Sequence, residues 1–400
     1  MIQCILQLVF LAVYGYLAVS TLYLLVLAVA GNRSTGFRHT DHHPVKKKMA
    51  LLIPAYREDA IIIDTAEKAA RHNYPGSFFQ VMVIADSLKK ETIAKLRNIP
   101  VQVLEVQFDV STKAKSIYAA LRHIKNDGVE IIVILDADNV MEDNCLEKIN
   151  GSFHYGCKAV QCHRIAKNED TPIALLGAIS EAININLFRR GTTALGLSAA
   201  PLGSGMAFEF GLINSVFEAA DIQQNPAEDR EIEIQLMKRE IRLEFLNEAY
   251  VYDEKVSSAG VFERQRIRWL EAQVNHIRRF YKADLNNTPK TPLYYHIFLQ
   301  NFLLPRVLYI FAACCVICIF IVQILFGVSL IYPGDGWWIA WITAYFLVLL
   351  FSIPSRFYTI KIFKAIAFIP VLVLSMLKAV LKLKRNRKEF LHTSKTFHAK

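Results

Sequence analysis

The sequence lacks the cysteine and histidine patterns of a zinc site or of a disulfide framework. Of its seven cysteines, only Cys315 and Cys318 have the Cys-x-x-Cys spacing, and no second pair or nearby histidine accompanies them. Because both lie in an apolar segment, we interpret them as small hydrophobic residues. An odd number of cysteines without a framework favours a reducing compartment over secretion. Internal repeats and low-complexity linkers are also absent.

Charge is scarce, with 20% charged residues against 53% hydrophobic ones, and the apolar excess is concentrated in charge-free runs toward the two ends of the chain. Residues 5–30 carry no charged side chain and are long enough to span about 30 Å of hydrocarbon as a helix. No basic residue precedes this run, and the run is too long for the core of a signal peptide. The pattern therefore predicts an uncleaved membrane anchor.

Two further charge-free runs, residues 307–326 and 337–353, are also long enough to span a membrane. A last run, residues 365–377, is shorter, contains Pro370 and is flanked by lysines, which favours an interfacial or re-entrant helix. Two spans after a cytoplasmic domain return the basic tail to the cytoplasm, whereas a third span would place that tail outside. We favour two C-terminal spans plus an interfacial helix, with three spans as the alternative.

Lysine and arginine outnumber acidic residues by 46 to 36, which gives a net charge of +10. These basic residues gather mainly beside the apolar ends, as at Arg33, Arg38 and residues 46–48. That distribution is typical of cytoplasmic membrane flanks, so no nucleic-acid partner is expected. The sequence predicts an integral protein of a plasma membrane or bacterial inner membrane, with its central part in the cytoplasm.

Short apolar runs alternate with helical patterns in the first part of this central region. Such alternation predicts an α/β fold with a mixed, mostly parallel sheet that is covered by helices on both faces. Helices are also expected over residues 171–191 and 259–281, with a break at the small residues 199–205. The predicted strands are residues 49–53, 79–85, 101–106, 130–135 and 158–165, and the intervening helices are 61–72, 88–97, 113–125 and 144–151.

Residues 130–139 are the stretch around which this region is organised. A continuous apolar run, typical of a strand buried on both faces, ends there in Asp136 and Asp138. Ligands of open α/β sheets bind beyond the carboxyl ends of the strands. Two carboxylates one residue apart supply hard oxygen ligands for a divalent cation, which can bind a diphosphate. Capping of the next helix is the alternative explanation.

Other polar residues follow neighbouring strands. Tyr56 and Glu58 come after the first strand, in a loop that suits either a nucleotide base or a helix N-terminus, and Asp86 ends the second. Lys115, near the start of the third helix, suits pairing with a phosphate, although a solvated lysine is the commoner explanation.

Two motifs lie nearer the C-terminal apolar region. Glu228 and Asp229 begin a helix, where acidic residues stabilise the first turn through the helix dipole, but Asp229 could instead deprotonate an acceptor hydroxyl. Gln265, Arg268 and Trp269 are spaced to lie on one helical face and suit stacking on a sugar. Interfacial anchoring by the tryptophan is the alternative.

Taken in order, these motifs resemble those of the membrane-integrated, inverting glycosyltransferases of family 2, which include the cellulose, hyaluronan, chitin and poly-N-acetylglucosamine synthases. This chain departs from the family pattern at Arg57, where asparagine is usual, at Ala114, where glycine is frequent, and at residues 208–210, where relatives often carry arginines. The matching motifs are Ile53-Pro54-Ala55-Tyr56, Asp86, Asp136-Ala137-Asp138, Gly203-Ser204-Gly205, Glu228-Asp229 and Gln265-x-x-Arg268-Trp269.

The resemblance implies a GT-A catalytic domain that uses a UDP-sugar with Mg²⁺ or Mn²⁺. It implies Asp229 as the general base and Asp136 and Asp138 as metal ligands. The implied donor-binding residues are Ala55, Tyr56, Glu58, Asp86, Lys115, Asp136 and Asp138. The implied acceptor-binding residues are Gly203, Ser204, Gly205, Glu228, Gln265, Arg268 and Trp269.

The expected activity is inverting transfer of a hexose or N-acetylhexosamine to a growing β-linked polysaccharide at the lipid bilayer, with additional synthase or export subunits as possible partners. One alternative is the transfer of a single sugar to a membrane lipid. Another, from a different class, is a transporter or assembly subunit with a degenerate transferase domain. The expected regions are an anchor (1–32), the GT-A domain (45–258), interfacial helices (259–303), a membrane region (304–384) and a basic cytoplasmic tail (385–400).

Overall fold

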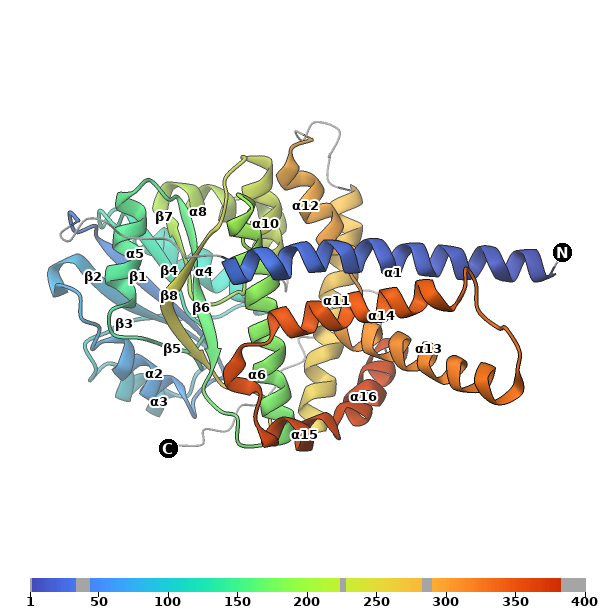
Figure 1. The fold of residues 1–400 in the computed structure, drawn as a ribbon. Helices are drawn as coiled ribbons and strands as arrows, with labels where there is room; N and C mark the ends of the chain where they lie inside the picture. Colours follow the sequence, from blue (N-terminus) through green and yellow to red (C-terminus); the bar gives the residue numbers. More distant parts are fainter. Residues whose placement is uncertain (1, 34–43, 224–227, 283–289, 383–400) are drawn as a thin grey trace.

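The computed structural model describes residues 2–33, 44–223, 228–282 and 290–382, which include an eight-stranded mixed sheet (Figure 1). The strand order is β3-β2-β1-β4-β7-β6-β8-β5. The strands are β1 (Met49–Tyr56), β2 (Phe79–Asp86), β3 (Gln102–Val106), β4 (Ile131–Ile134), β5 (Val140–Met141), β6 (Ala159–Ala166), β7 (Met206–Glu209) and β8 (Glu244–Asp253).

The first four strands form the parallel half of the sheet, as the alternating pattern predicted. β1 pairs in parallel with β2 on one side and with β4 on the other, and β3 extends the sheet beyond β2. The chain thus crosses from one side of β1 to the other between β3 and β4. Such a reversal opens a crevice at the carboxyl ends of the central strands, where ligands bind in open α/β sheets.

Helices cover both faces of the sheet because alternate residues of each buried strand point to opposite sides. Leu51 and Ile53 of β1 pack with α2 (Ile62–Ala69), α3 (Lys90–Leu96) and α5 (Cys145–His154). Ala50 and Leu52 face the other layer, which consists of α4 (Lys113–His123), α8 (Phe210–Phe217) and α10 (Glu228–Lys238).

The second half of the sheet contains strands that the sequence pattern did not predict. β7 lies antiparallel between β4 and β6, while β8 pairs in parallel with β6 and antiparallel with β5. β7 has only four residues and follows a glycine-rich loop, so its sequence carries little periodic signal. Its pairing partners on both sides hold it in the extended conformation. The predicted strand at residues 158–165 is confirmed as β6.

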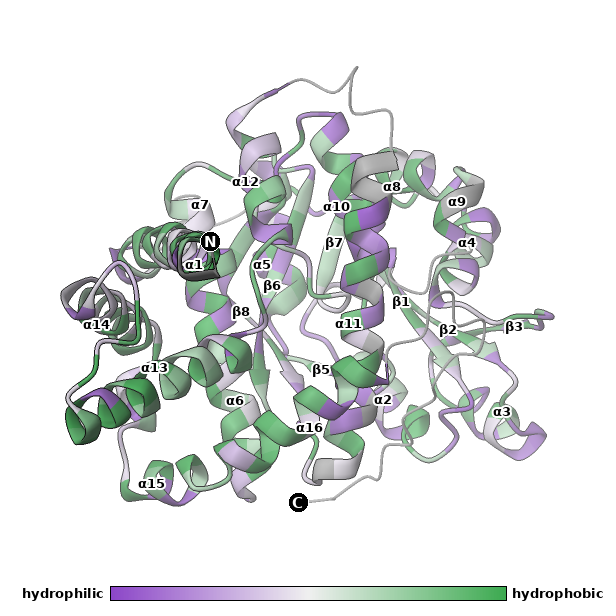
Figure 2. Cartoon of the chain, turned by 90° about the vertical axis from the view of Figure 1, so that its right-hand side faces the viewer, coloured by the Kyte–Doolittle hydropathy of each residue, from purple (hydrophilic) through white to green (hydrophobic). Residues whose placement is uncertain are grey.

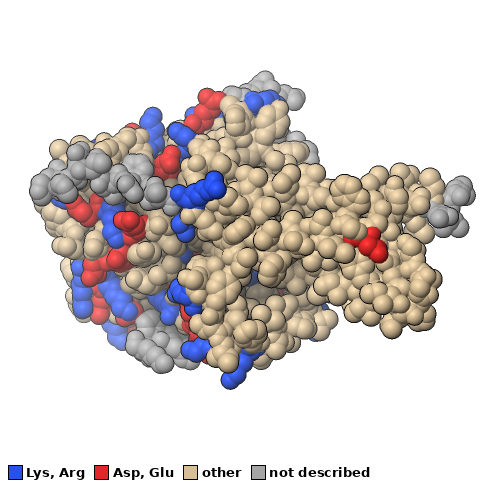
Figure 3. All heavy atoms as spheres, in the orientation of Figure 1, with Lys and Arg blue, Asp and Glu red and all other residues tan. Residues whose placement is uncertain are grey.

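Within the described part of the chain, three helices are long and apolar enough to cross a membrane: α1 (Ile2–Arg33), α13 (Arg306–Phe326) and α14 (Asp335–Ser352). They project from the sheet, and charged side chains are rare on the projecting part of the visible face (Figures 1 and 3). α15 (Ile360–Ile366) and α16 (Ile369–Leu381) meet at a 40° bend and would be a fourth span if they act as one. The expected tail at 385–400 lies outside the described residues.

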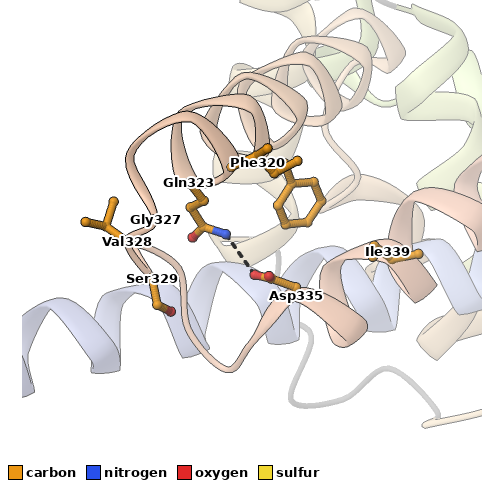
Figure 4. A pocket seen from close by; sticks show the side chains of 8 residues that line it. Phe320, Gln323, Gly327, Val328, Ser329, Asp335 and Ile339 are labelled. Carbon is orange, nitrogen blue, oxygen red and sulfur yellow. Dashed lines mark hydrogen bonds between the residues drawn. The ribbon is translucent and has the colours of Figure 1, made fainter.

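The turn between α13 and α14 contains a pocket of about 500 Å³ (Figure 4). Buried Gln323 organises this turn: its amide donates to Asp335 Oδ1 at 2.9 Å, and its oxygen accepts from the backbone of Leu330 at 2.7 Å. The pocket lies at the end of α13 that is remote from the sheet (Figure 1). It is therefore separate from the crevice at the strand ends.

Two long helices, α6 (Pro172–Ile185) and α11 (Ala259–Lys282), stand between the sheet and the membrane helices (Figures 1 and 2). α6 continues into a π-helical turn, η2 (Asn186–Gly191), whose backbone packs closely against α1. A side chain at Gly191 would place its Cβ 2.2 Å from the Leu27 carbonyl oxygen. The remaining helices are η1 (Gly76–Phe78), α7 (Thr192–Ala194), α9 (Ala220–Gln223), α12 (Pro292–Asn301) and η4 (Ser355–Phe357).

Candidate active site

The carboxyl ends of β1 and β2 bring two of the predicted donor-binding residues together. Tyr56 and Asp86 are register partners at the last position of their strands. Asp86 is 1% exposed, and its Oδ1 accepts a hydrogen bond from the Ser87 hydroxyl at 3.0 Å. Its Oδ2 is buried and has no hydrogen-bond partner within the described ranges. A buried carboxylate oxygen without a partner is costly, and an N–H group of a bound nucleotide base would satisfy it.

The chain turns sharply after both strands. Arg57 and Ser87 have φ values of 56° and 58°, in the left-handed region that non-glycine residues seldom adopt. Asparagine adopts this conformation more readily than arginine, so the structure gives a physical reason for the asparagine usual at position 57 in the family that the sequence resembles. The Arg57 guanidinium lies 5.1 Å from the centre of the Tyr56 ring.

The other two predicted residues of this first motif lie in β1 and at the start of α2. Ala55 is buried within β1. The backbone carbonyl of Glu58 accepts hydrogen bonds from Ile61 and Ile62 and so begins α2. The loop therefore provides a helix start as well as one edge of the crevice.

Asp136 and Asp138 lie in a turn directly beyond β4. The Asn139 amide donates to the Asp136 carbonyl at 3.0 Å, and the Thr65 hydroxyl donates to the Ala137 carbonyl at 2.6 Å. Within the described ranges, no group of three or more His, Cys, Asp or Glu side chains is arranged to hold a metal ion. Two carboxylates nevertheless fit Mg²⁺ or Mn²⁺, because such ions commonly take their other ligands from water and substrate phosphates.

Lys113, rather than the predicted Lys115, reaches Asp136. Its ammonium group donates to Asp136 Oδ1 at 2.6 Å and to the Gly203 carbonyl, and it lies 3.1 Å from Glu228 Oε1. Burial lowers the pKa of Lys113, but the two carboxylates outweigh that effect and raise it above its usual value. The lysine is therefore a fixed positive charge between three motifs of the crevice.

Lys115 points elsewhere because residues two apart on a helix face nearly opposite directions. Its ammonium group donates to the Val110 carbonyl at 2.7 Å and lies 5.8 Å from the centre of the Phe108 ring. Ala114, between the two lysines, is completely buried in the layer that packs on the sheet. The structure thus brings Lys113, and not Lys115, to Asp136.

The Gly203-Ser204-Gly205 loop packs directly on the aspartate turn. The buried Ser204 hydroxyl accepts from the Asp136 amide at 3.0 Å and contacts the Asn139 side chain at 2.6 Å. Gly205 has φ of 65°, and a Cβ there would lie 2.7 Å from Val251 Cγ2. The second glycine is therefore required by both backbone conformation and space.

Glu228 and Asp229 lie on the opposite side of this loop. A Cβ built on Gly203 would lie 3.8 Å from Asp229 Oδ2 and 3.9 Å from Glu228 Oε1, so both carboxylates face the loop. Burial, together with the charge of Asp229, raises the pKa of Glu228 despite the opposing effect of Lys113. The loop, the aspartate turn and the acidic pair thus converge on Lys113.

The three residues of the last predicted motif belong to α11. Trp269 is 42% exposed, and the guanidinium of Arg266 lies 4.3 Å from the centre of its ring. Gln265 precedes this stacked arginine by one residue and is half-buried. The Arg268 side chain lies outside the described part of the structure.

Arg189 is a positioning residue that the sequence reasoning missed. Its buried guanidinium donates to the carbonyls of Ala200 and Pro201, both at 2.8 Å, immediately before the glycine-rich loop. Burial is the main reason that its pKa is lowered to about 9. The sequence does place this arginine within a long apolar helical pattern, which is unusual. The direction of its side chain, however, depends on the π-helical turn η2, which only the structure shows.

A buried charge network behind the aspartate turn was also missed. The Arg164 guanidinium donates to both oxygens of Glu181, at 2.9 and 3.2 Å, and to the Leu202 carbonyl at 3.2 Å. Lys255 lies 3.3 Å from Glu181 and 2.5 Å from Asp253. This network connects β6, β8 and α6 to the start of the glycine-rich loop.

Comparison with solved structures concerns the fold of the chain. A mannosyltransferase from Pyrobaculum calidifontis, solved in complex with GDP-Man and Mn²⁺, has a similar fold, with a TM-score of 0.55, 15% identity, and coverage of 94% of this chain and 98% of its own. TarS 1-349 from S. aureus in complex with UDP-GlcNAc matches with a TM-score of 0.42, 13% identity, and coverage of 85% and 93%. No curated protein sequence matches this chain.

A family model described as glycosyltransferase like family 2 matches residues 46–272, which is more than half of the chain. The matched range contains the sheet, the aspartate turn, the glycine-rich loop, the acidic pair and the start of α11. The fold is the α/β GT-A type expected from the sequence. The chain belongs to glycosyltransferase family 2 and is a nucleotide-sugar-dependent glycosyltransferase with apolar helices at both ends.

Proposed function

We propose that the chain transfers a hexose or N-acetylhexosamine from a UDP-sugar to an acceptor hydroxyl at the membrane, with inversion and a β-linked product. The convergence of Asp136, Glu228 and the Gly203 loop on Lys113 carries this proposal. A growing polysaccharide is the first candidate acceptor, and a membrane lipid is the second. The basic flanks at residues 46–48 support a cytoplasmic orientation of the sheet domain.

The proposed reaction follows from the side chains that line the two sides of the site. The bond between the sugar C1 and the diphosphate oxygen breaks, the acceptor oxygen bonds to C1 from the opposite face, and the hydroxyl proton passes to Asp229. Lys113 provides fixed positive charge for the diphosphate that leaves. Asp136 and Asp138 would hold Mg²⁺ or Mn²⁺, which supplies further positive charge to the diphosphate. Asp86 would accept a hydrogen bond from the base.

Replacing Lys113 with methionine should lower kcat by about 10²- to 10³-fold, because a fixed positive charge beside the leaving group is lost. Lys115→Met, which removes the same charge two residues away, should change kcat by less than about threefold. Initial rates with saturating donor test both variants, with thermal unfolding curves to confirm that each one folds. Equal losses in the two variants would contradict the placement of Lys113 at the diphosphate.

The full-length protein in nanodiscs, incubated with labelled UDP- and GDP-sugars and Mn²⁺, tests the proposed activity. GDP-mannose is included because the mannosyltransferase of similar fold from Pyrobaculum calidifontis was solved with GDP-Man. We expect turnover of a UDP-sugar that EDTA abolishes, and product sizing then separates a polymer from a single-sugar lipid. Turnover of GDP-sugars alone would overturn the donor assignment. Binding of donor and metal without any turnover would favour a degenerate transferase domain.

A further inference from the structure

Arg266 on α11 and Arg306 at the start of α13 are two arginines that the donor site does not use. Arg306 donates to the Ser180 hydroxyl at 2.8 Å and to the side-chain oxygen of Asn184 at 2.7 Å, which are neutral acceptors on α6. Among the residues that the structure describes, neither arginine has a carboxylate within ion-pair distance. Both arginines are partly buried, and a cation in such a position normally has an anionic partner, so an anion is expected beside each of them.

Arg266 is held in place by aromatic rings rather than by an acid. Its guanidinium lies 4.6 Å from the centre of the Phe262 ring and 4.3 Å from that of Trp269. Its Nε is buried without a hydrogen-bond partner within the described ranges. Stacking fixes the plane of the guanidinium, and the planar fork of an arginine matches the oxygens of a phosphate.

The two arginines belong to one seam between helices. Val307, next to Arg306, packs with Ile267 and Leu270 of α11 and with Met376 of α16. Burial lowers the pKa of Arg266 to about 10, and the positive charge of Arg306 contributes to this shift. The two like charges thus repel each other across a partly buried seam.

The carboxylate of Glu181 does not neutralise this pair. Glu181 on α6 affects the pKa of Arg266, but both of its oxygens are bound by Arg164, and one lies 3.3 Å from Lys255. The seam between α6, α11 and α13 therefore carries surplus positive charge. An anionic group from outside the chain would balance it.

The position of Arg306 indicates where such an anion comes from. It is the first residue of α13, a helix long and apolar enough to cross a membrane. The start of a spanning helix lies at the level of lipid headgroups, and Trp269, at 42% exposure, suits the same interface. A lipid phosphate at this depth could bind both guanidinium groups while the acyl or prenyl chains of the lipid remain in the bilayer.

We propose that Arg266 and Arg306 bind the phosphate group of a lipid that serves as the acceptor or as the anchor of the growing glycan. The proposal rests on the proposed function, because it places the acceptor beside the α11 motif. Free inorganic phosphate has the same chemistry and is the alternative source of the anion. An uncharged lipid does not match the surplus charge.

Binding of two matched lipids to the full-length protein in neutral detergent, without any sugar donor, tests this inference. Dioleoyl phosphatidic acid and dioleoylglycerol differ only in the phosphate. We expect the phosphatidic acid to bind at least about tenfold more tightly. Arg266→Gln and Arg306→Gln should each weaken its binding by about 10- to 100-fold and leave dioleoylglycerol binding unchanged.

Arg356→Gln is the matched control, because Arg356 is another arginine of the membrane region but is half-exposed and lies 3.3 Å from Glu169. Its affinity for phosphatidic acid should equal that of the unmodified protein, and Arg306→Lys should recover part of the loss. Equal binding of the two lipids, or equal loss in the control, would overturn the site. Displacement of the lipid by millimolar inorganic phosphate would overturn the lipid as its source. Since no turnover is measured, the test is independent of whether the proposed transfer occurs.

Discussion

Asp229→Asn should lower kcat by about 10²- to 10⁴-fold, the usual loss when a general base is removed. The asparagine keeps the shape of the side chain, and its oxygen can still accept the hydrogen bond that Oδ1 receives from the Arg230 amide at 2.8 Å. The helix start and the packing beside Gly203 should therefore survive. What is lost is the ability to take a proton from the acceptor. Single-turnover rates with saturating donor measure this step most directly.

Glu231→Gln is the control for this variant because it removes one negative charge from the same first turn of α10. Its side chain bonds Gln235 within the helix, and we expect a change in kcat of less than about threefold. A loss below about tenfold for Asp229→Asn would exclude it as the base. The donor KM should stay constant in both variants, since neither carboxylate is assigned to the donor.

Glu181→Gln should lower the free energy of unfolding by about 3–5 kcal/mol, because it breaks a buried ion pair from one side. Arg164 loses its bidentate partner, and Lys255 loses one of its two carboxylate partners while it keeps Asp253. The same change should loosen the glycine-rich loop, since Arg164 also donates to the Leu202 carbonyl. Denaturation of the full-length protein in detergent measures the stability, and donor KM reports on the loop.

The effect of Glu181 on stability should depend on pH. Burial opposes its ionisation, but Arg164 and Lys255 outweigh burial and hold its pKa below the usual 4.5. Its stabilising contribution is therefore complete above that value and is lost as the pH falls toward the lower pKa of the folded state. Glu105→Gln, at an exposed pair with Arg97, should cost only about 0–1 kcal/mol. A similar small cost for Glu181→Gln would contradict the buried network.

The sequence predicted the parallel half of the sheet because each strand there is a continuous apolar run followed by a helical pattern. It did not predict β7, whose four residues become a strand through pairing with β4 and β6. The sequence motifs predicted that the aspartate turn, the glycine-rich loop and the acidic pair form one site. In the structure these three segments lie together around Lys113. The sequence analysis selected Lys115, whereas the structure brings Lys113 to Asp136. The sequence pattern does not show which face of this helix packs on the sheet, so it could not distinguish the two lysines.

Other parts of the site depend on contacts between distant segments. Glu181 and Arg164 lie in α6 and β6, and neither has a local pattern that marks it as buried. The position of the Arg189 side chain could not be predicted, because it depends on a π-helical turn, which has no simple sequence signature. The two C-terminal spans were expected within about two residues of α13 and α14, whereas the relation of α15 and α16 to the bilayer remains a prediction.

The close packing of α1 on the π-helical turn has a practical consequence for producing this enzyme. The Asn186 side chain donates to the Ala28 carbonyl at 3.2 Å, and Gly191 has no room for a Cβ beside Leu27. Removal of residues 1–44 to obtain a soluble protein would therefore expose the turn that carries Arg189. Kinetic constants from such a truncated protein would describe an enzyme whose glycine-rich loop has lost the support that the first helix gives to Arg189.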